Sequence, residues 1–240
     1  MDSNIEYLSL KEINTNMKSK LKEKLISLYK DSNHGWLYHS LKWLEFVDCY
    51  EKVSSSGFLI KYDNENDIEG FLSFSIFNNQ LKKRISLLEN GIGWPILALS
   101  ANLSVEDELL RALREIGLKE ECEQIIINIR NPLVSQKDLI KRQLKVTSLG
   151  YKSIIQSNHF IKMDNWEDKI RKRYKRYIRK YLKFFKISII NSKNIINLEE
   201  TAKEYMQLHI KDAGRKTRNL ESYIKQVEFI KEDEGFFVKA

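Results

Sequence analysis

The clearest chemistry in this sequence lies between Lys169 and Lys186, a segment (KIRKRYKRYIRKYLKFFK) with ten Lys and Arg residues and no acid. Apolar residues recur in it at helical spacing, which predicts a helix with one apolar stripe and cations on its other faces. The stripe consists of Ile170, Tyr174, Tyr177, Ile178, Tyr181, Leu182 and Phe185. Such a stripe indicates that the helix packs on something and presents its charge outward.

Cations four residues apart on a helix repel one another, so this helix costs stability unless an anionic partner compensates its charge. We therefore interpret it as the contact to a polyanionic partner, although a solvated helix face is the alternative. The residues assigned to this contact are Lys172, Arg173, Arg176 and Arg179. The aromatic residues of the stripe are expected in the core, since helical spacing favours packing over base stacking.

A second cation-rich stretch, AGRKTR at 213–218, follows a predicted helix. Its Arg215 and Arg218 are candidates for binding an oxyanion, because guanidinium groups bind carboxylate and phosphate at two points. The alternative is a helix C-terminus that favours cations for its own stability. His209 lies nearby and is a weak candidate for a general base, with an ordinary surface or half-buried histidine as the alternative.

The segment Gly91-Ile92-Gly93-Trp94-Pro95 predicts a turn between two strands. Gly93 would let the backbone approach a ligand closely and Trp94 would offer a flat apolar wall, so both are assigned to an acceptor cleft. The alternative is a tight turn with the tryptophan in the core. Arg130 follows a predicted buried strand, where a charged residue contacts a ligand in many α/β proteins, although an exposed arginine there is equally ordinary.

Other kinds of site lack support in the sequence. The four histidines are scattered, and Cys49 and Cys122 are isolated, so no metal site is expected. There is no Gly-x-Ser-x-Gly, no P-loop and no dinucleotide fingerprint. No apolar run approaches the ~20 residues of a membrane span, and the N-terminus does not resemble a secretory signal. We expect a cytoplasmic protein with reduced thiols.

The charge is unevenly distributed over the 240 residues. Residues 164–240 hold 19 basic and 12 acidic side chains, whereas residues 1–163 hold 22 and 21, so nearly all of the net charge of +8 lies in the last third. The content of 42% apolar residues predicts a globular protein.

The apolar periodicity predicts helices and strands in an order that places these residues. Helices are expected at 14–30, 39–50, 105–117, 135–149, 164–184, 198–212 and 220–231. Strands are expected at 58–62, 70–77, 85–88, 96–99, 122–129, 154–163, 186–191 and 235–240. Ser104 is expected to cap the third helix and Gly117 to end it, and Asp164 with Glu167 to cap the basic helix.

The predicted fold is α/β (α+β), a mixed and mainly antiparallel sheet flanked by helices. We expect one domain over residues 1–163, then a linking helix and the start of a second domain over 164–240. The strands of the latter part would either extend the first sheet or belong to a second domain that is cut off, and the second interpretation is favoured.

Taken in order, these segments resemble the FemAB-type acyltransferases of the GNAT superfamily, which have two tandem domains. The similarity rests on His39-Ser40-x-x-Trp43, on Gly91–Pro95, on INIRN at 127–131 and on Asn158–Ile190, the most specific stretch. The stretches LHIKDAGRKTRNLESY and GFFVKA resemble a further block of that family. This sequence departs from it late in the basic helix, where Tyr181, Phe184 and Phe185 stand in place of small residues.

The resemblance implies a GNAT-like fold and transfer of an acyl or aminoacyl group to an amine of a cell-wall precursor or a nucleotide-sugar intermediate. The donor would be acyl-CoA or aminoacyl-tRNA, used as a co-substrate without a permanently bound cofactor. Both donors are polyanions, which agrees with the interpretation of the basic helix. In the second domain, the donor site of this fold would lie beyond Ala240.

Two other functions remain open at this point. One is a non-catalytic nucleic-acid-binding protein that uses helix 169–186 on phosphates. The other is an adaptor without catalytic activity. The catalytic base, the donor, the acceptor and the oligomeric state do not follow from the sequence.

Overall fold

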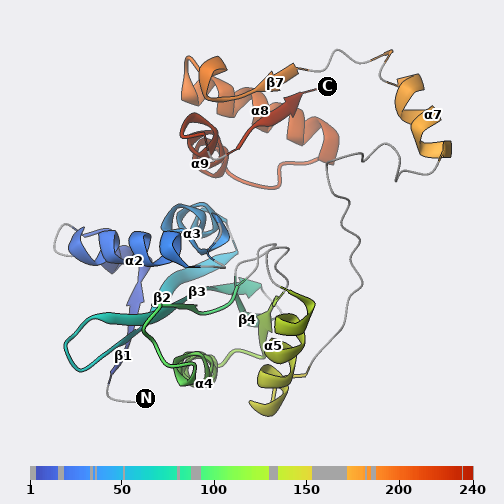
Figure 1. The fold of residues 1–240 in the computed structure, drawn as a ribbon. Coiled ribbons are helices and arrows are strands. Elements are labelled where there is room, and N and C mark those ends of the chain that lie inside the picture. The colour runs from blue at the N-terminus through green and yellow to red at the C-terminus, as the bar shows by residue number, and fades with distance from the viewer. Residues whose placement is uncertain are drawn as a thin grey trace. The chain divides into compact units, whose positions relative to one another are not determined.

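The computed structural model describes residues 4–15, 19–32, 35, 37–50, 52–79, 82–87, 93–129, 135–152, 172–181, 183–184, 188–233 and 235–239. The chain divides into two compact units, Met1–Ser153 and Ile154–Ala240 (Figure 1). Each unit is described by itself.

The described elements of the first unit are β1 (Ile5–Ser9), α1 (Leu10–Ile13), α2 (Ser19–Asp31), η2 (Leu37–His39), α3 (Leu41–Asp48), β2 (Val53–Tyr62), β3 (Ile68–Asn79), β4 (Lys82–Leu87), β5 (Ile96–Leu97), α4 (Ser104–Lys119), β6 (Gln124–Ile127) and α5 (Gln136–Ser148). The sheet has the order β1-β2-β3-β4-β6, with β5 paired to β3. All of its pairs are antiparallel except β4 with β6, which are parallel. This confirms the predicted mixed, mainly antiparallel sheet.

Side chains of successive strand residues point to opposite faces of a sheet. The apolar residues of β2 therefore lie on both faces, and helices cover each face. On one face, Phe58 and Ile60 of β2 join a cluster with Leu25 of α2 and Leu44 of α3. On the other face, Leu59 of β2 joins a cluster built on α4. Figure 1 shows α2 and α3 on one side of the strands and α4 on the other. One cluster therefore fixes α2 and α3 against the sheet, and the other fixes α4.

Several local predictions for the first unit are correct. The residues expected to face inward from α3, Leu41, Leu44, Phe46 and Val47, are all buried. The helix predicted at 135–149 is α5, which lies at Gln136–Ser148 with Ser135 as its N-cap. Gly150 ends that helix with a φ of +87°, a conformation that favours glycine.

Other boundaries differ from the predictions. Strand β1 was not predicted, and the helix expected at 14–30 is preceded by the separate short helix α1, which Ser9 and Glu12 close with a capping box. The N-cap of α4 is Leu103 and makes no side-chain cap bond, so the prediction for Ser104 is wrong. Gly117 does not end α4, because a β-carbon there would come within 2.8 Å of Ile125 and the glycine packs inside the helix against the sheet.

The described elements of the second unit are α7 (Lys172–Tyr181), β7 (Ser188–Ile190), the short helix η3 (Ser192–Asn194), α8 (Leu198–Ala213), α9 (Leu220–Lys231) and β8 (Phe237–Lys239). Strands β7 and β8 pair with each other, antiparallel, in a two-stranded sheet of their own. One of the two alternatives drawn from the sequence required these strands to extend the first sheet, and they do not. Ala202, Tyr223, Val227 and Ile230 form the core between α8 and α9.

The second unit repeats the order of elements that opens the first. In the first unit, β1 is followed by a short capped helix and then by α2, α3 and the antiparallel partner β2. In the second, β7 is followed by η3, α8, α9 and the antiparallel partner β8. A capping box closes the short helix in both places, on Ser9 and on Asn191. The interpretation of 164–240 as the opening of a second domain of the same kind stays a prediction.

Some predictions fall outside the described residues. These are the strand at 154–163, the cap formed by Asp164 and Glu167, the first part of the basic helix, and Arg130. Of the predicted basic helix, the structure describes α7 and the turn at 183–184.

Candidate functional site

The strand beside β3 is interrupted, and this interruption is the most distinctive feature of the first sheet. Strand β4 pairs with the second half of β3, where Ser86 lies opposite Ser75, and β5 resumes on the same edge, where Ile96 lies opposite Phe71. Strand β4 ends at Leu87 and β5 begins at Ile96, so the ladder along this edge of β3 is broken between the two strands. We call this place the interrupted edge.

The interrupted edge coincides with the carboxyl end of the parallel pair. Strand β6 pairs with β4 up to the register Leu87 opposite Ile127, so both strands end at the same side of the sheet. Ligands of α/β proteins bind where neighbouring parallel strands end. Gly93 and Trp94 follow β4 and belong to this edge, and Arg130 follows β6 three residues after Ile127 but lies outside the described part of the chain.

Gly93 lies against Leu87, the last residue of β4. A β-carbon built at Gly93 would lie 2.3 Å from the β-carbon of Leu87 and 3.0 Å from its carbonyl oxygen. Only glycine allows this approach without a shift of the backbone. Gly93 therefore allows the chain before β5 to pack directly against the end of β4.

Trp94 is a core residue, with 1% of its surface exposed. Its Nε1–H donates to Oε1 of Glu106, in the first turn of α4, at 3.0 Å. The guanidinium of Arg142 from α5 lies over the indole ring, 4.8 Å from the ring centre. Trp94 thus ties the interrupted edge to both helices and lies in the core, as the alternative interpretation of this turn expected, so its side chain does not form the exposed apolar wall of a cleft.

Lys145 of α5 binds the carboxylates of Glu106 and Asp107 in the first turn of α4. Its Nζ lies 2.9 Å from Oε2 of Glu106 and 3.0 Å from Oδ1 of Asp107. Burial disfavours the charge of Lys145, but the hydrogen bonds to the two carboxylates outweigh it and raise its pKa. Burial lowers the pKa of Arg142, against the attraction of Glu106 and Asp138.

The N-terminus of α4 is not arranged to bind a phosphate. Helix N-termini bind anions through free backbone N–H groups and a positive dipole end. Here Glu106 and Asp107 occupy the first turn, and the side chain of Asn102 accepts from the N–H of Ser104 at 3.0 Å. The helix therefore supplies its own negative charge at the position where an anionic ligand would otherwise bind.

In the second unit, the residues predicted at 209–218 come together in part. Nδ1 of His209 and Oγ1 of Thr217 are 3.3 Å apart, so a hydrogen bond joins α8 to the loop before α9. The guanidinium of Arg218 lies 4.6 Å from the centre of the Tyr223 ring, and His209 contacts the same ring edge-to-face. His209 and Arg218 are partly buried around Tyr223, whereas Arg215 is exposed.

The four cations assigned to a polyanionic partner lie on α7. Lys172, Arg173, Arg176 and Arg179 are exposed. Two aromatic residues of the stripe are exposed as well, Tyr174 by 58% and Tyr177 by 42%, and Phe184 is exposed by 74%. The expectation that these aromatic residues lie in the core is therefore wrong for these three side chains, because no described residue covers them.

Sequence reasoning missed Glu106, Arg142 and Lys145. They lie 12 to 51 residues from Trp94 along the chain, and no local spacing links them to it. Within the described ranges, no group of three or more His, Cys, Asp or Glu side chains is arranged to hold a metal ion. The same residues include no helix of the length and hydropathy needed to cross a membrane.

No protein-family model matches the sequence. No curated protein matches it either.

Solved structures with a similar course of the chain include three acetyltransferases. A ribosomal-protein-alanine N-acetyltransferase from Brucella melitensis biovar Abortus 2308 is 11% identical, with a TM-score of 0.41 over 67% of this chain and 99% of that one. An aminoglycoside N-acetyltransferase in complex with CoA is 13% identical, with a TM-score of 0.40 over 66% and 98%. An acetyltransferase from Trypanosoma brucei is 14% identical, with a TM-score of 0.39 over 66% and 99%. Similarity of this degree assigns neither a substrate nor residue roles.

Proposed function

We propose that this protein transfers an acyl or aminoacyl group to an amine. The observation that carries the proposal is the interrupted edge, where Gly93 and Trp94 leave the strand ladder beside the ends of β4 and β6. Backbone N–H groups outside a ladder are free to stabilise the oxyanion that forms when an amine attacks a carbonyl. The resemblance of Asn158–Ile190 to FemAB-type acyltransferases supports the same reaction class.

The reaction forms a C–N bond to the acceptor amine and breaks the C–S bond of acyl-CoA or the C–O ester bond of aminoacyl-tRNA. The acceptor nitrogen attacks the donor carbonyl, the oxyanion collapses, and the thiol of CoA or a ribose hydroxyl of tRNA leaves. A base removes the proton of the amine, and this proton ends on the leaving group or in water. His209 is the weak candidate for this base, because its ring is partly buried and oriented by Thr217.

The donor is acyl-CoA or aminoacyl-tRNA, and the acceptor is an amine of a cell-wall precursor or a nucleotide-sugar intermediate in the cytoplasm. The phosphates of either donor need cations. Helix α7 supplies exposed cations, and Arg215 and Arg218 add two more in the second unit. We assign donor binding to these groups.

The test compares two variants with four Lys or Arg residues changed to Gln. The first changes Lys172, Arg173, Arg176 and Arg179. The matched control changes four exposed lysines of the first unit, Lys11, Lys20, Lys30 and Lys137. Transfer to a panel of amines is measured with labelled acetyl-CoA and with labelled aminoacyl-tRNA.

A donor-binding role predicts a higher KM for the donor in the α7 variant only, with the chemical step less affected. Equal effects of both variants would contradict donor binding by α7. Absence of transfer by the parent chain with every donor and amine would contradict the function itself.

A second candidate function is nucleic-acid binding without catalysis. The exposure of Tyr174 and Tyr177 among the cations of α7 favours it, since aromatic rings stack on bases. A binder that neutralises Z phosphates loses affinity for a duplex with a logarithmic salt slope of about −0.9Z. Steep salt dependence on any duplex, together with no transfer, would replace the first proposal by this one.

A further inference from the structure

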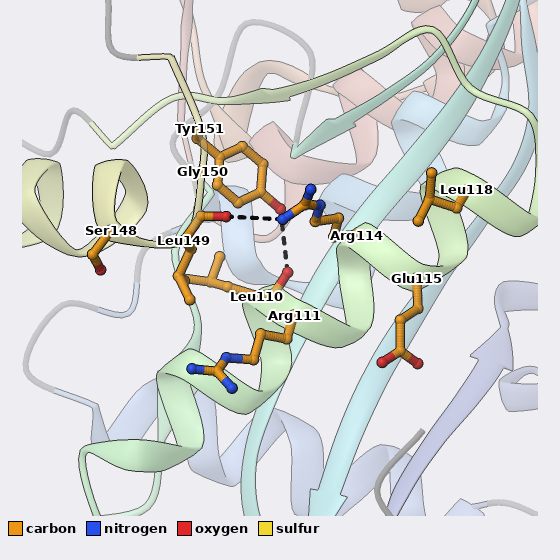
Figure 2. A pocket seen from close by; sticks show the side chains of 9 residues that line it. All are labelled: Leu110, Arg111, Arg114, Glu115, Leu118, Ser148, Leu149, Gly150 and Tyr151. Atoms are coloured by element: carbon orange, nitrogen blue, oxygen red, sulfur yellow. Dashed lines mark hydrogen bonds between the residues drawn. The ribbon is translucent and has the colours of Figure 1, made fainter.

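The first unit contains a cavity of about 530 Å³ that is separate from the interrupted edge. It lies between the second half of α4 and the chain that leaves α5 (Figure 2). Its lining residues are Leu110, Arg111, Arg114, Glu115, Leu118, Ser148, Leu149, Gly150 and Tyr151. Arg114 lies eight residues after Glu106 on the same helix, about 12 Å away at 1.5 Å per residue.

Two hydrogen bonds hold the walls of this cavity in place. Nη1 of Arg114 donates to the carbonyl oxygen of Leu149 at 3.3 Å, and the hydroxyl of Tyr151 donates to the carbonyl oxygen of Leu110 at 3.2 Å (Figure 2). Burial raises the pKa of Tyr151 to about 12, against the charge of Arg114, so the hydroxyl keeps the proton that it donates. The cavity is therefore formed before any ligand arrives.

The lining combines apolar surface with charged groups, namely the guanidinium groups of Arg111 and Arg114 and the carboxylate of Glu115. Leu110 is fully buried, and Tyr151 and Leu149 are partly buried, whereas Leu118 is exposed by 73%. Arg111 is exposed and, among the residues that the structure describes, has no hydrogen-bond or ion-pair partner. Leu118 lies seven residues after Arg111 on α4, about 10 Å along the helix axis, which suits an elongated ligand with an apolar part at one end and a negative group at the other.

We propose that this cavity binds a small amphipathic anion, with a carboxylate or phosphate at one end and an apolar group at the other. The anionic group contacts the guanidinium of Arg111, with Arg114 beside it, and the apolar group lies on Leu118 and Leu149. The volume falls in the range of about 300–1,000 Å³ that is typical of small-molecule sites. This site differs in place from the interrupted edge and does not depend on the proposed transfer reaction.

The test uses the full chain with three probes of equal chain length, namely octanoate, octyl phosphate and neutral octanamide. Titrations are followed by the amide NMR signals of the ¹⁵N-labelled protein. We expect both anions to shift signals of residues 110–118 and 148–151, and octanamide to bind about twofold to fivefold more weakly, since an exposed charge pair contributes up to ~1 kcal/mol. The preferred anion distinguishes a carboxylate ligand from a phosphate ligand.

Two variants place the contact. Arg111→Gln should weaken octanoate binding by about twofold to fivefold and leave octanamide unchanged, because it removes only an exposed charge pair. Lys137→Gln, an exposed cation on the first turn of α5, is the matched control and should leave both unchanged. Equal binding of octanoate and octanamide, shifts confined to other residues, no binding of either anion, or unaltered octanoate binding by Arg111→Gln would each overturn the proposal.

Discussion

Replacing Glu106 by Ala should destabilise the first unit through its effect on Trp94. The indole N–H donates to this carboxylate at 3.0 Å, and Trp94 is only 1% exposed, so water cannot take the place of the lost acceptor. An unsatisfied buried donor costs about 1–3 kcal/mol. Lys145 loses one of two carboxylate partners but keeps Asp107 at 3.0 Å, which limits the additional loss.

We therefore expect a loss of about 2 kcal/mol, which corresponds to about 4–8 °C in Tm for a unit of this size. Urea unfolding followed by tryptophan fluorescence is a suitable measurement, because Trp36, Trp43 and Trp94 lie in the first unit and Trp166 alone lies in the second. Glu123→Ala, a change of an exposed glutamate, should stay within about 0.5 kcal/mol of the parent.

A double-mutant cycle with Trp94→Phe isolates the cause. Phenylalanine has no N–H, so Glu106→Ala no longer leaves a donor unsatisfied in that background, and its cost should fall by at least about 1 kcal/mol. If Glu106→Ala costs the same in both backgrounds, the hydrogen bond to Trp94 does not stabilise the edge and the reasoning is refuted.

Three further predictions concern single residues. Burial and the adjacent carboxylate of Glu6 raise the pKa of Tyr62 to about 12. The stability that the protonated phenol contributes is therefore fully present below about pH 10 and is lost as the pH rises from about 10 to about 12. Tyr62→Phe removes this pH dependence, so the urea midpoint should fall less over that range. Gly214 has a φ of +68° and open space around it, so Gly214→Ala should cost about 1 kcal/mol by urea unfolding. Gly235→Ala, with equal space and no positive φ, should cost close to nothing. Gly93→Ala should cost about 1–3 kcal/mol in the same assay, because its β-carbon would lie 2.3 Å from a carbon of the preceding strand, and no loss of stability would show that the loop relaxes freely.

The apolar pattern predicted most helices and strands because side-chain periodicity depends on neighbours in the sequence. Helix α9 was predicted at the residues where it lies, and so was the inward face of α3. Boundaries failed where a tertiary contact decided them. Gly117 predicts a helix end by its intrinsic preference, yet packing against Ile125 keeps it inside α4.

The same distinction between local sequence pattern and tertiary contact applies to the candidate residues. The sequence identified Gly93 and Trp94 as unusual, but not that β4 and β5 pair with the same edge of β3 on either side of them, because that follows from long-range pairing. It also did not predict that Glu106 and Lys145 hold the edge. A salt bridge between residues 39 positions apart leaves no periodic trace in the chain.

The sequence by itself therefore determined local features: the cations of α7, the glycine at Gly150 that ends a helix and the apolar run in β2. These features depend on residues within about one helical turn or one strand of each other. Only the tertiary structure decided which strand ends share an edge, which carboxylate receives the Trp94 indole, and that α4 and the end of α5 enclose a cavity. Those outcomes depend on long-range packing, which brings distant residues together without any spacing rule in the sequence.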